Sequence, residues 1–191
     1  MNLAALAAFD FAVNQKKANP FKDGNNQIRG KAMNTKKQKG FSLIELLIVV
    51  AIIGIIAAIA IPNLLNSQQA AHEVAALTEV KTIGNNQVLY SITKGHGKFA
   101  DLATLSANGM GDANMAKGEK GGYAFVSTPI NAEGMPNMFD TTAHPTAIGT
   151  FGTGNRSFYS NETMVVFEND GIQPPTATPQ DRVPKDGTPI Q

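Results

Sequence analysis

The chain has 191 residues, enough for one ordinary domain with additional segments but not for two large domains. It contains no cysteine, which excludes disulfide bonds, thiol catalysis and the usual zinc-finger thiolates. Its net charge of +1 hides an asymmetry: residues 1–40 carry eight Lys and Arg against two Asp, whereas residues 41–191 carry eight against thirteen Asp and Glu. The basic residues precede an apolar segment and do not mark a folded surface, so nucleic-acid binding is not expected.

An apolar segment follows the basic region. From Leu43 to Ile61 every residue is apolar or glycine except Glu45. As a helix, this segment would be about 28 Å long, close to the hydrocarbon thickness of a bilayer. Lysines flank only its amino-terminal side, so the positive-inside rule predicts residues 1–40 in the cytoplasm and the rest outside. The flanking lysines are Lys36, Lys37 and Lys39.

The helical pattern continues beyond the apolar segment. Apolar or small residues recur every three or four positions and predict one buried face; they are Val74, Leu77, Val80, Gly84 and Val88. Polar residues are expected on the other faces: Gln68, Gln69, Glu73, Glu79, Lys81 and Asn85. The pattern predicts one helix from about Ser42 to about Thr93, kinked near Pro62, with an apolar half over 41–61 and an amphipathic half over 62–93.

The remainder, residues 94–171, is predicted to form a globular head. Glycines at 95–97 and 109–111 indicate the end of the helix and a loop region. Strands are expected at 123–126 and 138–142, and a hairpin from 157–159 and 164–167 with its turn at 161–163, followed by a turn at Asp170-Gly171. Residues 172–191 are rich in proline and are predicted to be extended and poorly ordered. The fold class expected is therefore α+β, with the long helix packed on a small antiparallel sheet.

One stretch resembles a known family. The segment 40-GFSLIELLIVVAIIGIIAAIAIPNLL-65 is similar to the signature of type IV pilins and of the related pseudopilins of type II secretion. It has a glycine before an aromatic residue, a glutamate fifth after that glycine, the apolar run, and later a glycine and a proline. Two fragments of the head, 118–128 and 153–171, are similar to heads of some cysteine-free pilin-like proteins.

The resemblance implies processing at the start of the apolar segment. A membrane-embedded prepilin peptidase would cut between Gly40 and Phe41 and methylate the new amine of Phe41, with the three lysines holding the leader at the cytoplasmic face. The functional leader would be residues 33–40, beginning at Met33. Residues 1–32 do not resemble such a leader. Either they reflect an upstream start codon, or they form a real long leader in which 3–13 makes a short interfacial helix.

The resemblance also gives Glu45 a role. A carboxylate in a bilayer costs at least about 2 kcal/mol, so it must be neutralised or find a partner. In the family, this residue meets the amino terminus of a neighbouring subunit and sets the register of assembly. Two local alternatives are a capping box within Ser42-Leu43-Ile44-Glu45 and pairing with the amine of its own Phe41.

Other candidates carry weaker signals. Gly54 and Pro62 suit local bending of the helix during assembly, or are simply tolerated in a membrane helix. The histidines His72, His96 and His144 lack metal-ligand spacing and are expected at the surface. Residues 168–171 fit a hairpin turn better than a calcium loop. Ser157 and Ser160 lack the surroundings of a catalytic nucleophile, and Gly149–Gly154 is expected to be a loop and not a phosphate site.

The expected function is that of a non-enzymatic filament subunit with no cofactor and no metal. Its partners would be the peptidase, other subunits, an inner-membrane assembly platform and a motor ATPase. It would sit in the inner membrane as a precursor and then in an extracellular pilus or a periplasmic pseudopilus. The first alternative is a type II secretion pseudopilin, and the second a signal-anchored periplasmic enzyme or binding protein. Major or minor status and a role in motility, adhesion, DNA uptake, electron transfer or secretion stay open. Many pilins close the sheet end with a disulfide, which this chain lacks; a tail lying across the head is one substitute.

Overall fold

The computed structural model describes residues 40–190. The chain divides into the units Met1–Phe41 and Ser42–Gln191, and the fold is that of the second. The three leader lysines and residues 1–32, on which part of the predicted leader depends, lie outside the described residues.

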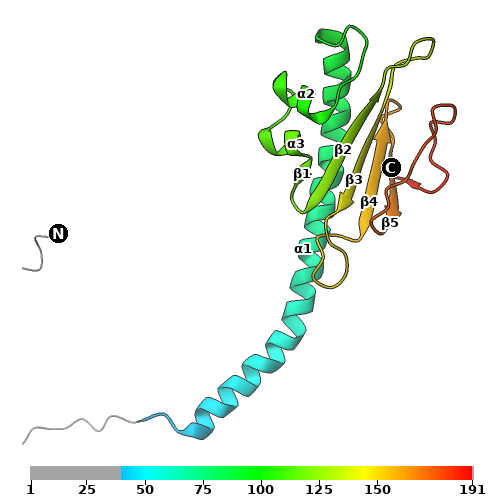
Figure 1. Ribbon diagram of the computed structural model, residues 1–191. Coiled ribbons are helices and arrows are strands. Elements are labelled where there is room, and N and C mark those ends of the chain that lie inside the picture. The colour runs from blue at the N-terminus through cyan, green and yellow to red at the C-terminus, as the bar shows by residue number, and fades with distance from the viewer. Residues whose placement is uncertain (1–39, 191) are drawn as a thin grey trace, which may run out of the picture. The chain divides into compact units, whose positions relative to one another are not determined.

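The second unit begins with one long helix, α1 (Leu43–Thr93), of 51 residues. The helix predicted from Ser42 to Thr93 is therefore confirmed to within one residue. Pro62 lies inside α1 without interrupting it. Figure 1 shows α1 curving along its projecting half, whereas the other half stands against the head. A kink at Pro62 itself stays a prediction, because the curvature is not confined to one turn.

Two short helices and a short strand occupy the region that was expected to be a loop. They are α2 (Leu102–Ala107), α3 (Ala113–Lys117) and β1 (Glu119–Lys120). Asp101 caps α2 by accepting a hydrogen bond from the Thr104 amide at 2.8 Å, and Asp112 caps α3 in the same way with Met115 at 2.7 Å. Gly118 ends α3 with a φ of 74°, a left-handed conformation that favours glycine.

The sheet is antiparallel and follows the chain order β1-β2-β3-β4-β5-β6. Its longer strands are β2 (Tyr123–Ile130), β3 (Met138–Pro145), β4 (Arg156–Asn161) and β5 (Val166–Asp170), and β6 (Thr188–Ile190) closes one edge. All four predicted strands exist, the hairpin turns at residues 161–165, and Gly171 ends β5 with a φ of 91°. The α+β fold class is confirmed.

The core lies between α1, the short helices and one face of the sheet. Val80 and Ile83 of α1 and Leu105 of α2 are fully buried there against Tyr123 and Phe158. Strand β4 is buried on both faces: Phe158 belongs to this core, whereas its neighbour Tyr159 is also buried, with its ring 6.5 Å from that of Phe167. A second layer must therefore cover the other face of the sheet.

The carboxy-terminal segment supplies that layer, so the prediction of a poorly ordered tail is wrong. Its β6 strand pairs with β5, Pro175 and Pro184 are buried, and the Asn161 side chain donates to the Arg182 carbonyl at 2.7 Å. The proline content remains compatible with an extended path. The tail thus lies across the head, as one of the alternatives above supposed.

The buried face of α1 differs from the predicted one. Val80 and Gly84 are buried as expected, but Val74 and Val88 are 60% and 41% exposed. The buried positions also include three polar residues, Gln69, Glu73 and Gln87. Apolar periodicity assigned Gln69 and Glu73 to solvent because it counts polar side chains as exposed, whereas these side chains bind the head.

Candidate assembly helix and its junction with the head

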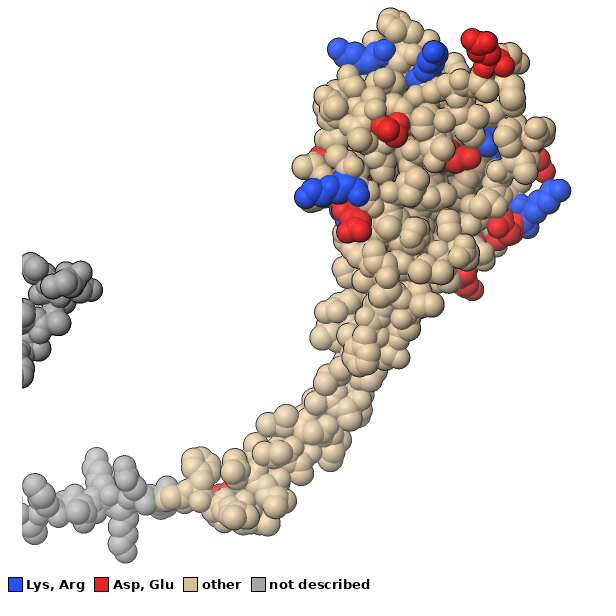
Figure 2. Space-filling view, viewed as in Figure 1, with Lys and Arg blue, Asp and Glu red and all other residues tan. Residues whose placement is uncertain are grey.

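The projecting half of α1 has no partner in the described chain. Its large apolar side chains from Leu43 to Leu64 are 50–79% exposed. Within residues 40–190, α1 is the one helix long and apolar enough to cross a membrane. Figure 2 shows this part as an uncharged stem except near its start, with the Lys, Arg, Asp and Glu side chains gathered on the head. Such a continuous apolar surface requires lipid or other protein around it.

The predicted processing site lies just before α1. Phe41 is 92% exposed, and Gly40 has no heavy atom within 4 Å of the position that a Cβ would take. Neither residue is therefore covered by the described part of the chain. Cleavage and methylation at this bond stay predictions.

Glu45 is folded back on the start of the helix. Its Oε2 accepts a hydrogen bond from the backbone amide of Ser42 at 2.9 Å, and Ser42 is the extended N-cap residue. This contact satisfies one of the amide groups left free at a helix start. It is the local arrangement considered above, and within residues 40–190 it leaves the second carboxylate oxygen free to accept another donor. Intermolecular pairing of Glu45 stays a prediction.

Gly54 and Pro62 lie in the exposed half of α1. An added Cβ at Gly54 would meet nothing within 4 Å, so glycine is not needed there for packing within the chain. Pro62 has no amide hydrogen, so the carbonyl of residue 58 loses its helical partner. Both residues weaken the helix locally, which is consistent with the predicted bending but does not demonstrate it.

Gln69 joins the helix to the loop between β3 and β4. Its Nε2 donates to the carbonyls of Gly149 and Gly152 at 2.7 and 3.2 Å, and its Oε1 accepts from the Asn155 side chain at 3.2 Å. One side chain thus satisfies three polar groups of a glycine-rich loop. Residues 149–154 form a loop, as the sequence predicted, and its role here is to attach the head to the helix.

Glu73 makes the second attachment, one turn further along α1. Its carboxylate accepts from the Asn155 amide at 2.7 Å and from Arg156 Nε at 2.8 Å, and Arg156 also binds Glu168 at 2.6 Å. The Glu73 side chain is only 9% exposed. Burial would lower the pKa of Arg156, but the hydrogen bond and charge of Glu73 outweigh it and hold that pKa above its ordinary value. Arg156 therefore stays ionised beside Glu73.

Gln87 makes the third attachment, near the far end of α1. Its amide nitrogen donates to the Ala100 carbonyl and, at 2.7 Å, to Ser127 Oγ, while its Oε1 accepts from the Ala100 amide at 3.0 Å. Gln87 is completely buried. Because a buried glutamine must satisfy its amide group, these contacts fix how the chain turns after the helix.

Arg182 fastens the carboxy-terminal segment to the sheet, where no disulfide is possible. It binds Glu162 through Nε at 2.6 Å and Asp140 through Nη2 at 2.6 Å, and Nη2 also donates to the Phe139 carbonyl at 2.9 Å. Burial opposes ionisation of Glu162, but the hydrogen bonds and charge of Arg182 prevail and lower the pKa of Glu162. An arginine within a proline-rich segment was the one sign of this cluster in the sequence.

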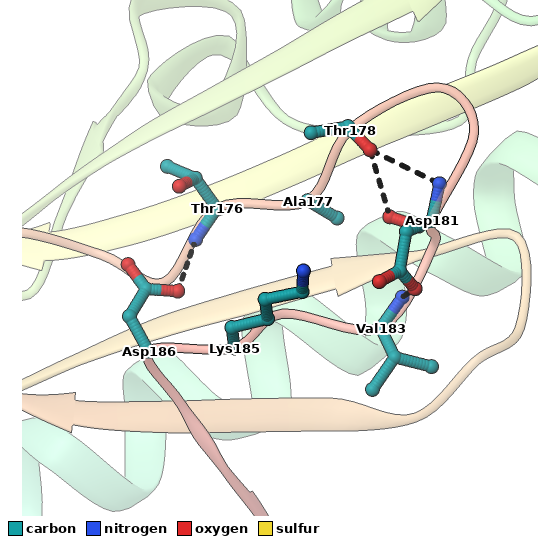
Figure 3. A pocket seen from close by; sticks show the side chains of 7 residues that line it. All are labelled: Thr176, Ala177, Thr178, Asp181, Val183, Lys185 and Asp186. Atoms are coloured by element: carbon teal, nitrogen blue, oxygen red, sulfur yellow. Dashed lines mark hydrogen bonds between the residues drawn. The ribbon is translucent and has the colours of Figure 1, made fainter.

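The tail also encloses a hollow of about 250 Å³. Figure 3 shows its lining, where backbone amides of the loop donate to Asp186, Asp181 and Thr178. These contacts shape the loop itself. None of the residues predicted from the sequence as functional lines this hollow.

The serines, the histidines and residues 168–171, considered above as candidates, lie in α1, in strands or in turns of the fold. Ser157 and Ser160 are buried and donate to the carbonyls of Gly171 and Val165. His96 is exposed, and His72 and His144 are half-buried. Residues 168–170 end strand β5 at the turn, and within residues 40–190 no group of three His, Asp or Glu side chains is placed to hold a metal ion.

Comparison with known proteins finds a family motif in the segment that includes the start of α1. A family model described as the prokaryotic N-terminal methylation motif matches residues 35–61. The chain carries this methylation motif. The match includes the lysines, the Gly40-Phe41 bond, Glu45 and Gly54, and it ends one residue before Pro62.

Similar proteins are pilins and secretion proteins. The chain is 32% identical over 62 residues to the type II secretion system core protein G of Escherichia coli, which covers 32% of the chain and 43% of that protein. It is 41% identical over 87 residues to the type IV major pilin protein PilA of Myxococcus xanthus, or 46% of the chain and 36% of PilA. It is 37% identical over 99 residues to the fimbrial protein Q of Moraxella bovis, or 47% of the chain and 63% of that protein.

These alignments span less than two thirds of each relative. The search of solved structures found no significant match. The methylation motif and the similar pilins and secretion proteins confirm the resemblance to type IV pilins and to type II secretion pseudopilins.

Proposed function

We propose that this chain is a structural subunit of a type IV pilus-like filament. It is made as a membrane-anchored precursor, is cut between Gly40 and Phe41, and assembles through the projecting half of α1. The observation that carries this proposal is a helix half that is apolar on all sides, has no packing partner in the part of the chain that the structure describes, and bears one carboxylate at its start. The match to the methylation motif and the likeness to pilins support it.

The physics of assembly assigns Glu45 a specific task. Moving α1 from lipid to a bundle of like helices gains little from the hydrophobic effect, because lipid is as apolar as the helix. Packing and polar contacts must therefore select the register. Glu45 is the only charged residue between Phe41 and His72, so it is the polar group available for this purpose. Cleavage after Gly40 creates its partner, the cationic amine of Phe41 on an incoming subunit.

The monomer geometry is compatible with this exchange. Among residues 40–190, Glu45 binds only the Ser42 amide, through one oxygen, in an exposed position. A cationic amine would therefore add a charge-assisted bond without first breaking a buried network. The subunit has no catalytic role of its own in this proposal: the peptidase performs the chemistry, and an inner-membrane platform with a cytoplasmic motor ATPase supplies the work. Residues 1–40 face the cytoplasm and the head faces outward.

A pseudopilin is the second candidate, and the similarity to core protein G favours it. In that case the same helix would assemble a short periplasmic structure. The two candidates share processing and the role of Glu45, and they differ in where the polymer is found.

The test compares Glu45→Gln with Glu79→Gln in cells that make the filament. Glu79 is a carboxylate on the same helix whose bond to Lys120 involves a 42% exposed lysine, so its loss is mild. We expect Glu45→Gln to abolish polymer while precursor accumulates in the membrane, and Glu79→Gln to assemble normally. If Glu45→Gln leaves the protein fully functional, the chain is instead a signal-anchored enzyme or binding protein.

Mass spectrometry of sheared material completes the test. An extracellular fraction with N-methylated Phe41 as its first residue supports the pilus, and the same species found only in the envelope supports the pseudopilus. Polymer that still begins at Met1 or Met33 contradicts the processing step.

A further inference from the structure

The loop between β3 and β4 exposes large apolar side chains next to the helix. Ile148 is 56% exposed and Phe151 is 83% exposed, and the segment from Thr141 to Asn155 contains no Lys, Arg, Asp or Glu. Ile172 follows Gly171, whose amide donates to the Asn155 carbonyl at 2.7 Å, and is 42% exposed at the same end of the head. Figure 1 shows this loop at the end of the head from which the projecting half of α1 emerges.

The loop is held in place. Gln69 binds the carbonyls of Gly149 and Gly152, and within the loop the amides of Gly152 and Thr153 donate to the carbonyls of Gly149 and Ala147 at 2.9 and 2.8 Å. Several polar groups of the loop backbone are thus satisfied internally, while its apolar side chains point away from the core. An apolar surface of this kind can enter a less polar medium without leaving those groups unpaired.

The position along α1 sets the depth of the loop in a membrane. Between Glu45 and Glu73 the helix has no Lys, Arg, Asp or Glu over 27 residues. With Leu43–Ile61 in the hydrocarbon core, Gln69 lies eight residues, or about 12 Å, beyond its outer end. Gln69 therefore places the loop at the outer side of the headgroup region.

Charge marks the limit of this surface. Glu73, Arg156 and Glu168 begin just beyond Gln69 and are paired with one another. Asp170, opposite Arg156 in the strand register, lies at its border. Figure 2 shows the uncharged surface continuing from the stem onto the adjoining part of the head.

We propose that Ile148 and Phe151 make a second membrane contact, by inserting into the headgroup region of the leaflet on the side of the head. The partner is a phospholipid surface, because the patch adjoins the uncharged part of α1 and sits at headgroup depth. Apolar and aromatic side chains beside a polar backbone suit that region. This inference rests on the membrane-anchored precursor of the proposed function. The contact would orient the head on the membrane and would be broken when the subunit leaves it.

The test uses the absence of tryptophan from the chain. Three single-tryptophan variants of the full chain, Phe151→Trp, Ile92→Trp and Ile53→Trp, are reconstituted in phosphatidylcholine vesicles with and without bromine-labelled lipid. Ile92 is the matched control, since it is 75% exposed and lies about 35 Å along α1 from Gln69. Ile53 reports insertion of the helix itself. Since Phe151 is highly exposed, its replacement by another aromatic residue should not disturb folding.

We expect bromolipid to quench the tryptophans at 151 and 53 but not at 92, with emission at 151 shifted to shorter wavelength. Quenching at 151 should not change as the protein-to-lipid ratio is lowered. Quenching at 53 without quenching at 151 overturns this inference and leaves the proposed function intact. A blue shift at 151 that disappears on dilution assigns the patch to a second copy of the chain and also overturns it. No quenching at 53 contradicts the membrane anchor of the proposed function.

Discussion

Replacing Arg182 with alanine removes the side chain that joins the carboxy-terminal segment to the sheet. Arg182 is 14% exposed, and its two carboxylate partners, Glu162 and Asp140, are each 25% exposed. Without Arg182 both carboxylates would remain close together and partly buried with no cation. Breaking a buried ion pair costs about 3–5 kcal/mol. Two features reduce this cost. The three side chains are partly exposed, and the substitution also removes the Nη1 atom of Arg182, which is buried and has no hydrogen-bond partner within residues 40–190.

The expected loss in the free energy of unfolding is therefore about 2–3 kcal/mol for Arg182→Ala. For a chain of this length, that corresponds to a melting temperature lower by roughly 4–12 °C. Near-ultraviolet circular dichroism of the full chain in detergent measures this melting temperature. Its signal reports on the head, because Tyr123 and Tyr159 are fully buried there and the chain has no tryptophan. Lys185→Ala is the control, since this lysine is an exposed neighbour in the same segment, and it should stay within about 0.5 kcal/mol.

The ion pair between Arg182 and Glu162 also predicts that the free energy of unfolding depends on pH. Because the folded pKa of Glu162 is lowered, its contribution is present above the usual glutamate pKa of about 4.3 and is lost as the pH falls through the lower folded value. The difference in the free energy of unfolding between the wild type and Arg182→Ala should therefore shrink as the pH falls below the usual glutamate pKa and through the folded pKa of Glu162. If the two proteins melt together at pH 7, or if their difference grows in acid, the reasoning about this cluster is wrong.

Three further predictions concern α1. Glu73→Gln should destabilise the head by about 2 kcal/mol, because Arg156 loses one of its two carboxylate partners and keeps only Glu168, and the loss should appear in the same tyrosine melting experiment. Gln87→Leu should cost about 1–3 kcal/mol, because both backbone groups of Ala100 lose their partners, and hydrogen exchange of the Ala100 amide should accelerate. Gly54→Ala should favour the helix by about 0.5–1 kcal/mol without a clash. If bending at Gly54 serves assembly, this variant should insert normally but yield less polymer; unchanged polymer would show that Gly54 is merely tolerated.

Regular patterns made the main elements predictable. The start and end of α1 follow from the N-cap Ser42 and the glycines after Thr93, and β2 to β5 follow from their apolar and β-branched residues. Short elements were missed although their signals were present. Asp101 and Asp112 each stand before a stretch that begins a helix, and an aspartate in this position is a recognised N-cap.

The attachment of the head to the helix could not be predicted from periodicity. Gln69 and Glu73 are polar, so a hydropathy pattern assigns them to solvent, yet their partners lie about eighty residues further along the chain. Only the folded chain brings those partners together. The same reason explains the error over the tail: its proline content suggested poor order, whereas Arg182 and β6 bind the sheet. The processing site and Glu45 stood out in the sequence because a single charge in an apolar run is conspicuous without any knowledge of the fold.

The strand order has a consequence for how the head forms. Each strand from β2 to β6 pairs with the strand that precedes it in the described chain, so every pairing joins consecutive strands. In the membrane-anchored precursor of the proposed function, strands can therefore be added in the order in which they follow α1. The segment after β5 carries Arg182 and β6, which complete the second face of β4. Chains that end before Arg182 would keep the meander from β1 to β5 but expose part of that face, and a protease would have a distinct surface to recognise.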